Sequence, residues 1–450
     1  MNVLNHRILR IGTGAGFSGD RIEPAVELCE KGDIDYLVFE CLAERTIALA
    51  QLEKLSNPNG GYDKLLEQRM VAVLPICYKK NIKIITNMGA ANPLAASKKV
   101  QEVARSLGIH GLKIATIMGD DVADKIDKKN CLLDTTQASI SDLGDKFISA
   151  NAYIGVESIV DALAQNADVI ITGRASDPSM FLAPQIYEFG WAMDDWVKLG
   201  RGTIIGHMLE CAGQVTGGYF SDPGQKEVPN LAELGFPLAE IDFEGNAVIT
   251  KVEGSGGIVS EATCKEQLLY EIHDPKSYLQ PDVIADFSNV IIERVGENRV
   301  AITGGSGYAR TDKLKVSIGY DDSWVGEGQI SYAGLGCVER GKQAIKIIEK
   351  RISLTEINCT ETRGDLIGMN AILGEHGNNF ANPYEIRVRF AARCPDKFNA
   401  ERICQEVESL YLNGPSGGGG VVTSFKKIIA VASTLIPKQL VDTNVKILES

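Results

Sequence analysis

Strand-like segments alternate with helix-like segments along the first 205 residues, and this alternation constrains the fold more than any other feature of the sequence. Short apolar runs at residues 35–40, 82–87, 113–118 and 168–172 are typical of buried strands, and amphipathic stretches separate them. Asn92 followed by Pro93 is a typical helix start, and Asp177 followed by Pro178 repeats it. Such an order forms parallel strands joined by right-handed helical crossovers. The sequence therefore predicts an N-terminal doubly wound parallel α/β sheet of the Rossmann or flavodoxin type.

The pattern changes after about residue 205. Strand pairs are predicted at residues 239–252 and 290–303, each around a glycine turn. Strand, helix, strand, strand, helix and strand then follow at 314–320, 339–352, 354–360, 384–392, 399–412 and 425–435. That order is typical of a ferredoxin-like α+β unit. Since 450 residues exceed one ordinary core, we expect an α/β ligand-binding domain at 1–205 and an α+β domain at 206–450, with a further boundary near 312.

Charge and hydropathy restrict the partners and the compartment. The net charge of −13 argues against nucleic acid or an anionic membrane surface as a main partner. The first ten residues lack the apolar run of a signal peptide, and no stretch approaches the roughly 18 apolar residues of a membrane span. None of the ten cysteines forms a Cys-x-x-Cys pair, which favours reduced thiols. We therefore expect a cytoplasmic protein with no membrane partner, and a homo-oligomer by default.

The first glycine loop follows a predicted strand and has the spacing G-x-G-x-x-G, which ends at Gly19. This spacing, with Glu40 at the end of the next strand, is the dinucleotide fingerprint. However, Pro24 places the helix start near residue 23, too far along for its N-terminus to face a pyrophosphate. A nicotinamide or flavin cofactor, another phosphate or carboxylate, and a tight strand exit all stay open. The candidate ligand-binding residues of this loop are Gly14, Gly16, Ser18 and Asp20.

Two further loops lie between a predicted strand and a helix, one with Asn87 and Gly89 and one with Gly173, Arg174 and Asp177. Ligands of parallel sheets bind at the carboxyl ends of the strands, where these loops must lie. A guanidinium such as that of Arg174 can bind a carboxylate or phosphate through two parallel hydrogen bonds. Its alternative role is a structural ion pair with a neighbouring aspartate.

Four acids, Glu40, Glu44, Asp120 and Asp121, follow strands at the same predicted edge. They could hold a divalent metal or supply a general base, or they could be helix caps and ion-pair partners. His207, Glu210 and Cys211 have the i, i+3, i+4 spacing that places three side chains on one helix face. Acid–base or metal chemistry and a purely structural role both fit that spacing.

The chain resembles the acyclic terpene utilisation (AtuA) family from the first glycine loop nearly to the C-terminus. The resemblance rests on long motifs in a fixed order: residues 11–20, 35–38, 42–44, 119–121, 173–178, 181–184, 206–211, 216–220, 268–275 and 417–420. It implies a place in bacterial catabolism of citronellol- and geraniol-type compounds through acyl-CoA intermediates. No single reaction is attached to the family as a whole.

Together these features predict an enzyme of lyase or hydratase type that acts on a small carboxylic acid or its CoA thioester in acyclic terpenoid or branched-chain acid catabolism. Gly14, Gly16, Asp20 and Gly89 would hold the anionic end of the substrate, and Arg174 would clamp a carboxylate. Asp120 or Asp121 would act as a base or metal ligand, and His207 with Glu210 in acid–base work. The alternatives are an NAD(P)-dependent oxidoreductase and a non-catalytic subunit of an acyl-CoA-metabolising complex. A divalent metal or CoA is open as a cofactor, and NAD(P) is less favoured.

Overall fold

The computed structural model describes residues 7–374, 376 and 383–450, and these residues form two compact units. Unit 1 comprises the chain up to Gly319 together with Val431–Ser450, and unit 2 comprises Tyr320–Ala430. The boundary predicted at residue 205 falls inside helix α7 (Trp196–Glu210) of unit 1. The further boundary predicted near 312 falls just before strand β14 (Lys313–Ala333), in which unit 2 begins.

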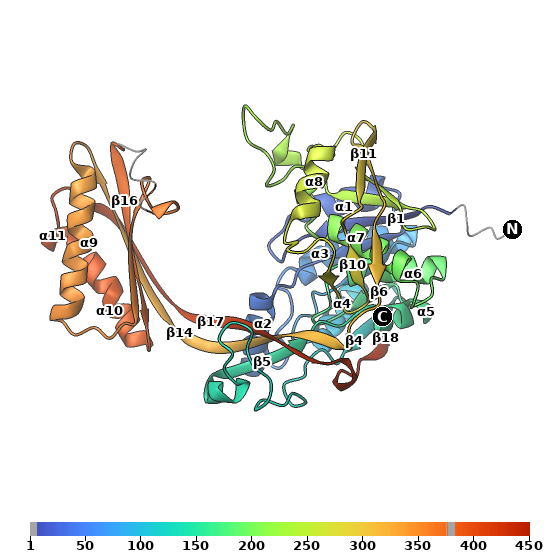
Figure 1. Ribbon diagram of the computed structural model, residues 1–450, viewed down its shortest axis with the longest axis horizontal. Coiled ribbons are helices and arrows are strands. Elements are labelled where there is room, and N and C mark those ends of the chain that lie inside the picture. The colour runs from blue at the N-terminus through green and yellow to red at the C-terminus, as the bar shows by residue number, and fades with distance from the viewer. Residues whose placement is uncertain (1–6, 375, 377–382) are drawn as a thin grey trace. The chain divides into compact units, whose positions relative to one another are not determined.

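The core of unit 1 is a ten-stranded mixed sheet, of which five neighbouring strands are parallel (Figure 1). The parallel strands stand in the order β1-β2-β3-β6-β4. They are β1 (Leu9–Ala15), β2 (Tyr36–Phe39), β3 (Lys83–Thr86), β6 (Val169–Ile171) and β4 (Lys113–Met118). All five occur where the sequence predicts strands, because short runs of Val, Ile, Leu and Tyr bury both faces of a strand.

Antiparallel strands extend this sheet on both sides, so the expectation of a purely parallel sheet confined to residues 1–205 is wrong. Beside β1 lie β7, β8, β12 and β11 in that order, and beside β4 lies β18. Their bounds are β7 (Pro237–Ile241), β8 (Ala247–Lys251), β11 (Ile291–Gly296), β12 (Arg299–Thr303) and β18 (Asn444–Glu449). The two predicted strand pairs are therefore hairpins of the main sheet, because the exposed edge of β1 offers unpaired backbone groups.

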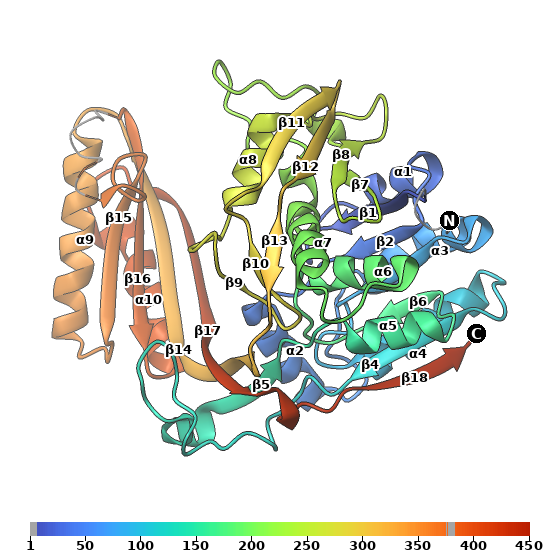
Figure 2. The ribbon, with the colours of Figure 1, turned by 45° about the vertical axis from the view of Figure 1, so that its right-hand side comes forward.

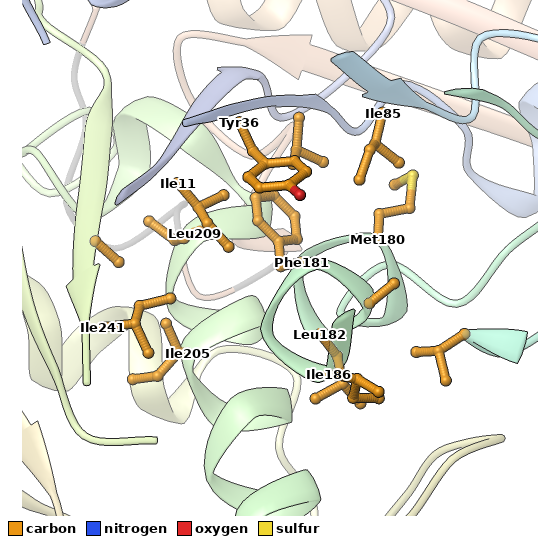
Figure 3. Packing of buried hydrophobic residues seen from close by; sticks show 14 of the residues in the cluster. Ile11, Tyr36, Ile85, Met180, Phe181, Leu182, Ile186, Ile205, Leu209 and Ile241 are labelled. Atoms are coloured by element: carbon orange, nitrogen blue, oxygen red, sulfur yellow. The ribbon is translucent and has the colours of Figure 1, made fainter. Parts of the chain in front are cut away.

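Helices cover both faces of the sheet, and alternate residues of each strand enter two separate cores. Leu37 and Phe39 of β2 pack with α1 (Glu23–Lys31), α3 (Leu66–Lys80) and α4 (Pro93–Ser106). Tyr36 and Val38 pack on the other face, which α5 (Glu157–Ala164), α6 (Ser179–Phe189) and α7 cover (Figure 2). In Figure 3 the side chains of β1, β2 and β3 meet those of α6 and α7 in this second core.

Of the two helix N-caps predicted from the sequence, Asn92 is confirmed and Asp177 is not. The Asn92 side chain accepts a hydrogen bond from the amide of Ala95 (3.3 Å) and caps α4, as predicted. Asp177 does not cap α6, because its carboxylate pairs with the guanidinium of Arg174 instead. The aspartate of this Asp-Pro sequence therefore forms an ion pair and not a helix cap.

Several smaller elements complete unit 1. Helix α2 (Glu44–Ser56) follows β2, and β5 (Phe147–Ala152) pairs with β14. Helix α8 (Glu261–Leu269) contacts α7 and β11. A separate three-stranded sheet has the order β13-β10-β9, with bounds Ser306–Tyr308, Ile284–Asp286 and Tyr278–Leu279.

The sheet of unit 2 has the order β15-β16-β14-β17, with β5 as the fifth strand beside β14, and helices pack against it. Strands β15, β16 and β14 run antiparallel to their neighbours in this series. The elements of unit 2 after β14 are α9 (Cys337–Leu354), β15 (Glu361–Ile367), β16 (Glu385–Cys394), α10 (Lys397–Glu408), α11 (Leu410–Asn413) and β17 (Gly419–Pro437). The strand predicted at 354–360 is wrong: it lies at 361–367, because the apolar residues that suggested it belong to the end of α9 and the turn after it.

Two predicted properties of the whole chain can be compared with the structure. Within the described ranges, no helix combines the length and the apolar character that crossing a membrane requires. The ten cysteines, all of which lie in these ranges, are free thiols.

Candidate functional site

The carboxyl ends of the five parallel strands bring most of the predicted site residues to one edge of the sheet. Strand β1 leads into the first glycine loop at Gly16, β2 ends just before Glu40, and β3 ends just before Asn87. Strand β6 leads to Arg174, and β4 leads to Asp120. Because these strands are parallel neighbours, the five positions share one edge.

The first glycine loop is held closed by its own side chains. The Asp20 carboxylate accepts hydrogen bonds from the amides of Gly16 (3.0 Å) and Arg21 (2.9 Å). A side chain at Gly16 would lie 2.6 Å from the carbonyl carbon of Cys211, and one at Gly14 would lie 2.5 Å from the Phe39 ring. Both glycines are thus explained by close packing, and the Gly16 amide already has an anionic partner.

Arg69, which the sequence analysis did not identify, holds this loop in place through hydrogen bonds to its backbone. Its fully buried guanidinium donates to the carbonyl oxygens of Ser18 (3.0 Å), Asp20 (3.2 Å) and Phe17 (3.4 Å). It also lies 3.4 Å from the Asp63 carboxylate, which accepts a hydrogen bond from the Ser18 hydroxyl (2.5 Å). The only sequence signal was an arginine on the apolar face of a predicted helix.

The second loop ties two strand ends together. The Asn87 amide donates to the Glu40 carboxylate (3.0 Å) and accepts from the backbone amide of Cys41 (2.7 Å). A side chain at Gly89 would lie 2.4 Å from the carbonyl oxygen of Thr172, so this glycine allows two loops to touch. Asn87 therefore orients Glu40.

Asp120 positions the third loop. Its Oδ2 accepts hydrogen bonds from the backbone amide of Arg174 and from Asn151 Nδ2, both at 2.9 Å. A side chain at Gly173 would lie 2.4 Å from the Asp120 carboxylate, so only glycine fits there. Burial raises the pKa of Asp120 to about 6 despite these two donors. Asp121 has a different partner, since its carboxylate accepts a bond from Gln51 (3.3 Å).

Arg174 is the most unusual side chain at this edge. Only 2% of its surface is exposed, and its guanidinium carbon lies 4.0 Å from the centre of the Tyr153 ring. Nη2 lies 3.1 Å from Asp177, but Nε and Nη1 have no hydrogen-bond partner among the described residues. Buried donors of this kind nearly always have a partner, so these two nitrogens mark a place for one.

Glu44 neutralises a second cation next to Arg174. Its carboxylate accepts hydrogen bonds from the Tyr153 hydroxyl and from Lys315 Nζ (3.1 Å). Burial alone would raise the pKa of Glu44, but the Tyr153 hydrogen bond and the Arg174 charge lower it to about 2. Glu44 is therefore an ion-pair partner that keeps its charge.

His207 and Glu210 form the pair that their spacing predicts, on the buried face of α7. His207 Nδ1 lies 2.9 Å from Glu210 Oε1, and Nε2 lies 2.9 Å from the carbonyl oxygen of Gln267. Burial alone would lower the pKa of His207, but two acceptors favour the doubly protonated ring and raise it. The second oxygen of Glu210, Oε2, is buried without a hydrogen-bond partner among the described residues.

These side chains form one electrostatic unit, which we name the Arg174 cluster: Arg174, Asp177, Glu40, Glu44 and Glu210. Burial raises the pKa of Glu40, and Arg174 partly opposes this effect. Burial also raises the pKa of Asp177, with Arg174 again opposing and Glu40 and Glu210 adding to the rise. A third of the Asp177 side chain is nevertheless exposed (33%). Burial thus raises the pKa of two carboxyl groups beside the guanidinium, and the Arg174 charge opposes the rise at both.

The described residues form no metal site at this cluster, and the cavities found among them lie elsewhere. Across the described parts of the chain, no three His, Cys, Asp or Glu side chains are arranged to hold a metal ion. A cavity of about 280 Å³ is lined by Tyr78, Lys83 and Asp168, among others. It lies at the amino ends of β3 and β6, opposite the edge that carries Arg174.

Fold and site together define a mixed α/β protein with a buried arginine–carboxylate cluster at the carboxyl ends of parallel strands. The chain belongs to the acyclic terpene utilisation family: the family described as "Acyclic terpene utilisation family protein AtuA" matches residues 9–447, which confirms the resemblance seen in the sequence. Membership implies a role in acyclic terpene utilisation and establishes no particular reaction.

Comparisons with individual proteins add little to this. No curated protein matches the chain. Among solved structures, the de novo designed protein Foldit4 matches with 17% identity and a TM-score of 0.18, covering 23% of this chain and 97% of the designed one. A similarity that low carries no argument about fold or function.

Proposed function

We propose that the protein is an enzyme of acyclic terpenoid or branched-chain acid catabolism, of lyase or hydratase type, whose Arg174 cluster binds a substrate carboxylate. The substrate is a small carboxylic acid, or a CoA thioester that carries a free carboxylate. The observation behind the proposal is the pair of buried donors, Nε and Nη1 of Arg174, that lack a partner among the described residues. Each of these nitrogens can donate a charge-assisted hydrogen bond to an oxygen of a ligand carboxylate.

The charges of the cluster are compatible with an anionic ligand. Glu44 is paired with Lys315, so its negative charge is offset. The raised pKa values of Glu40 and Asp177 mean that both take up a proton more readily than an exposed carboxylate, and a protonated carboxyl group can donate a hydrogen bond to a ligand oxygen. Tyr153 holds the guanidinium flat against its ring, so Arg174 is oriented before the ligand arrives.

The reaction that suits these groups is the removal or addition of water next to a carboxylate. In the removal direction, Glu210 Oε2 takes a proton from carbon and the C–H electrons form the new double bond. The C–O bond breaks, and the leaving oxygen takes a proton from Asp177 and departs as water. Such an elimination needs one base and one acid. The free oxygen of Glu210 would act as the base, and Asp177, whose pKa is raised by burial, would act as the acid once protonated.

Two finer statements about the fold are part of the same proposal. We infer that unit 2 is a ferredoxin-like unit, and the support is its βαββαβ element order with the sheet order β15-β16-β14-β17. We also infer that the parallel half of unit 1 is of the doubly wound Rossmann or flavodoxin type. The helices on both faces of strands β1 to β4 support this.

Isothermal titration calorimetry with 3-methylbut-2-enoate and 3-methylbutanoate tests the carboxylate site. We expect Arg174→Lys, which keeps the charge but loses the Nε and Nη1 donors, to weaken binding roughly 10- to 100-fold. The matched control is Arg351→Lys, which alters an exposed arginine of unit 2 paired with Glu406. Circular dichroism verifies that each variant is folded. If folded Arg174→Lys and Arg174→Gln bind the acids as tightly as the wild type, the proposal is wrong.

A further inference from the structure

Tyr278 lies beside the Arg174 cluster and contributes a rigidly held aromatic ring. It belongs to β9 of the three-stranded sheet and is half-buried. Its ring packs edge-on against Phe287 with centroids 5.4 Å apart, and tilted against His207 at 5.7 Å. His207 in turn packs edge-on against Phe287 at 5.4 Å. Three mutually packed rings fix the direction of the Tyr278 hydroxyl.

The hydroxyl of Tyr278 is an unused donor in the neighbourhood of the acids. It makes no hydrogen bond to the described residues, and it is not fully buried, so a ligand can reach it. Burial, followed by the charges of Glu210 and Asp177, raises the pKa of Tyr278 well above its ordinary value. The hydroxyl therefore stays protonated and donates, and it lies within electrostatic reach of both carboxyl groups.

The vacant hydrogen-bonding groups around the cluster differ in kind. Nε and Nη1 of Arg174 are donors, Oε2 of Glu210 is an acceptor, and the hydroxyl of Tyr278 is a donor. The vacant donors of Arg174 can each bind a carboxylate oxygen. Oε2 of Glu210 is an acceptor and the Tyr278 hydroxyl is a donor, and both residues contact His207. This pair matches a ligand group that donates and accepts at once.

We propose that Tyr278 donates a hydrogen bond to a substrate hydroxyl, so that the ligands of the Arg174 cluster are small hydroxy acids. The hydroxyl donates to Glu210 Oε2 and accepts from Tyr278. A keto group would leave Glu210 Oε2 without a donor, and an ammonium group would leave the Tyr278 donor without an acceptor. This inference rests on the proposed function, because it takes the carboxylate to be held by Arg174.

A comparison of matched ligands on matched variants tests the inference. The ligands are 3-hydroxy-3-methylbutanoate and 2-hydroxy-3-methylbutanoate, each against 3-methylbutanoate, which lacks only the hydroxyl. For the wild type we expect at least one hydroxy acid to bind roughly three- to tenfold tighter than 3-methylbutanoate, as one net hydrogen bond allows. Tyr278→Phe keeps the ring and should reduce this preference to near one, with the affinity for 3-methylbutanoate unchanged.

The control variant is Tyr308→Phe, which removes a tyrosine hydroxyl from the same small sheet. That hydroxyl already donates to Asp286 (2.9 Å), so the preference should stay at the wild-type value. Glu210→Gln is a second variant that removes the acceptor, and it should also lower the preference for the hydroxy acid. Melting temperatures of all variants report whether the packing is kept.

The outcomes separate the two proposals. If 3-methylbutanoate binds through Arg174 but Tyr278→Phe keeps the full preference for hydroxy acids, the role of Tyr278 is refuted and the carboxylate site stands. The same holds if the wild type shows no preference for either hydroxy acid. If none of the acids binds to the wild type, or if Arg174→Lys binds them equally well, both proposals fail together.

Discussion

Replacement of Arg69 by methionine should destabilise unit 1 strongly, because Arg69 is a buried cation that holds the first glycine loop. Its guanidinium donates to three loop carbonyl oxygens and lies 3.4 Å from the buried Asp63 carboxylate. Methionine fills a similar volume but leaves the three carbonyls and the Asp63 charge unpaired. Breaking a buried pair by removing one partner costs about 3–5 kcal/mol. Three unpaired acceptors at about 1 kcal/mol each lead to the same range.

Urea unfolding, followed through hydrogen exchange of peptides from β1 and α3, measures this loss in unit 1 without assuming that both units unfold together. Peptides that cover residues 14–22 should also exchange faster in Arg69→Met under native conditions. The matched control is Lys31→Met, which breaks the exposed Lys31–Glu27 pair on α1 (60% and 26% exposed). That pair should contribute at most about 0.5 kcal/mol.

A second substitution separates the charge from the hydrogen bonds. If the unpaired Asp63 carboxylate is a large part of the cost, Asp63→Asn added to Arg69→Met should restore at least about 1 kcal/mol. The reasoning would be refuted if Arg69→Met stayed within about 1 kcal/mol of the wild type and loop exchange were unchanged.

Two further substitutions test other contacts at the same edge. Gly16→Ala should lower the melting temperature by the equivalent of about 1–3 kcal/mol, because its Cβ would lie 2.6 Å from the Cys211 backbone. At Gly12 a Cβ would meet only side-chain atoms, of Ile34 (3.1 Å) and Leu28 (3.4 Å), so Gly12→Ala should cost less than Gly16→Ala. Equal losses of melting temperature in the two variants would contradict this reasoning. The pKa of Asp120 in the folded protein, about 6, lies above the ordinary aspartate value of 3.8, so the folded state binds the proton more tightly than the unfolded state. The free energy of unfolding therefore falls as the pH rises through that window. Asp120→Asn removes this pH dependence. Its free energy of unfolding relative to that of the wild type should therefore rise by about 2–3 kcal/mol between pH 4 and pH 8. If urea unfolding gave the same difference between the two proteins at both pH values, the raised pKa would be refuted.

The sequence by itself determined the features that depend on near neighbours in the chain. The five parallel strands were predicted because strands buried on both faces are short continuous apolar runs. Their parallel order follows from the helices between them, and it places Glu40, Asn87, Asp120 and Arg174 at one edge. The i, i+3 spacing likewise predicted the contact between His207 and Glu210, since helix geometry is local.

Only the tertiary structure decided which side chains are paired and which are free. Strand β18 pairs with β4 from the far end of the chain, and no local pattern indicates such a pairing. Arg69 and Asp63 were missed because one charged residue in a helix pattern looks the same whether it faces solvent or the core. The glycine loop showed a dinucleotide spacing, but the fold placed Asp20 on its amide and Cys211 against its backbone.

The same distinction applies to Arg174. The sequence placed it at the strand ends but left open whether an aspartate satisfies it. The structure shows that Asp177 pairs with Nη2 and that the Tyr153 ring covers one face of the guanidinium, while Nε and Nη1 stay without a partner among the described residues. Hydrogen bonding depends on distances between segments far apart in sequence, and those distances exist only after the chain has folded.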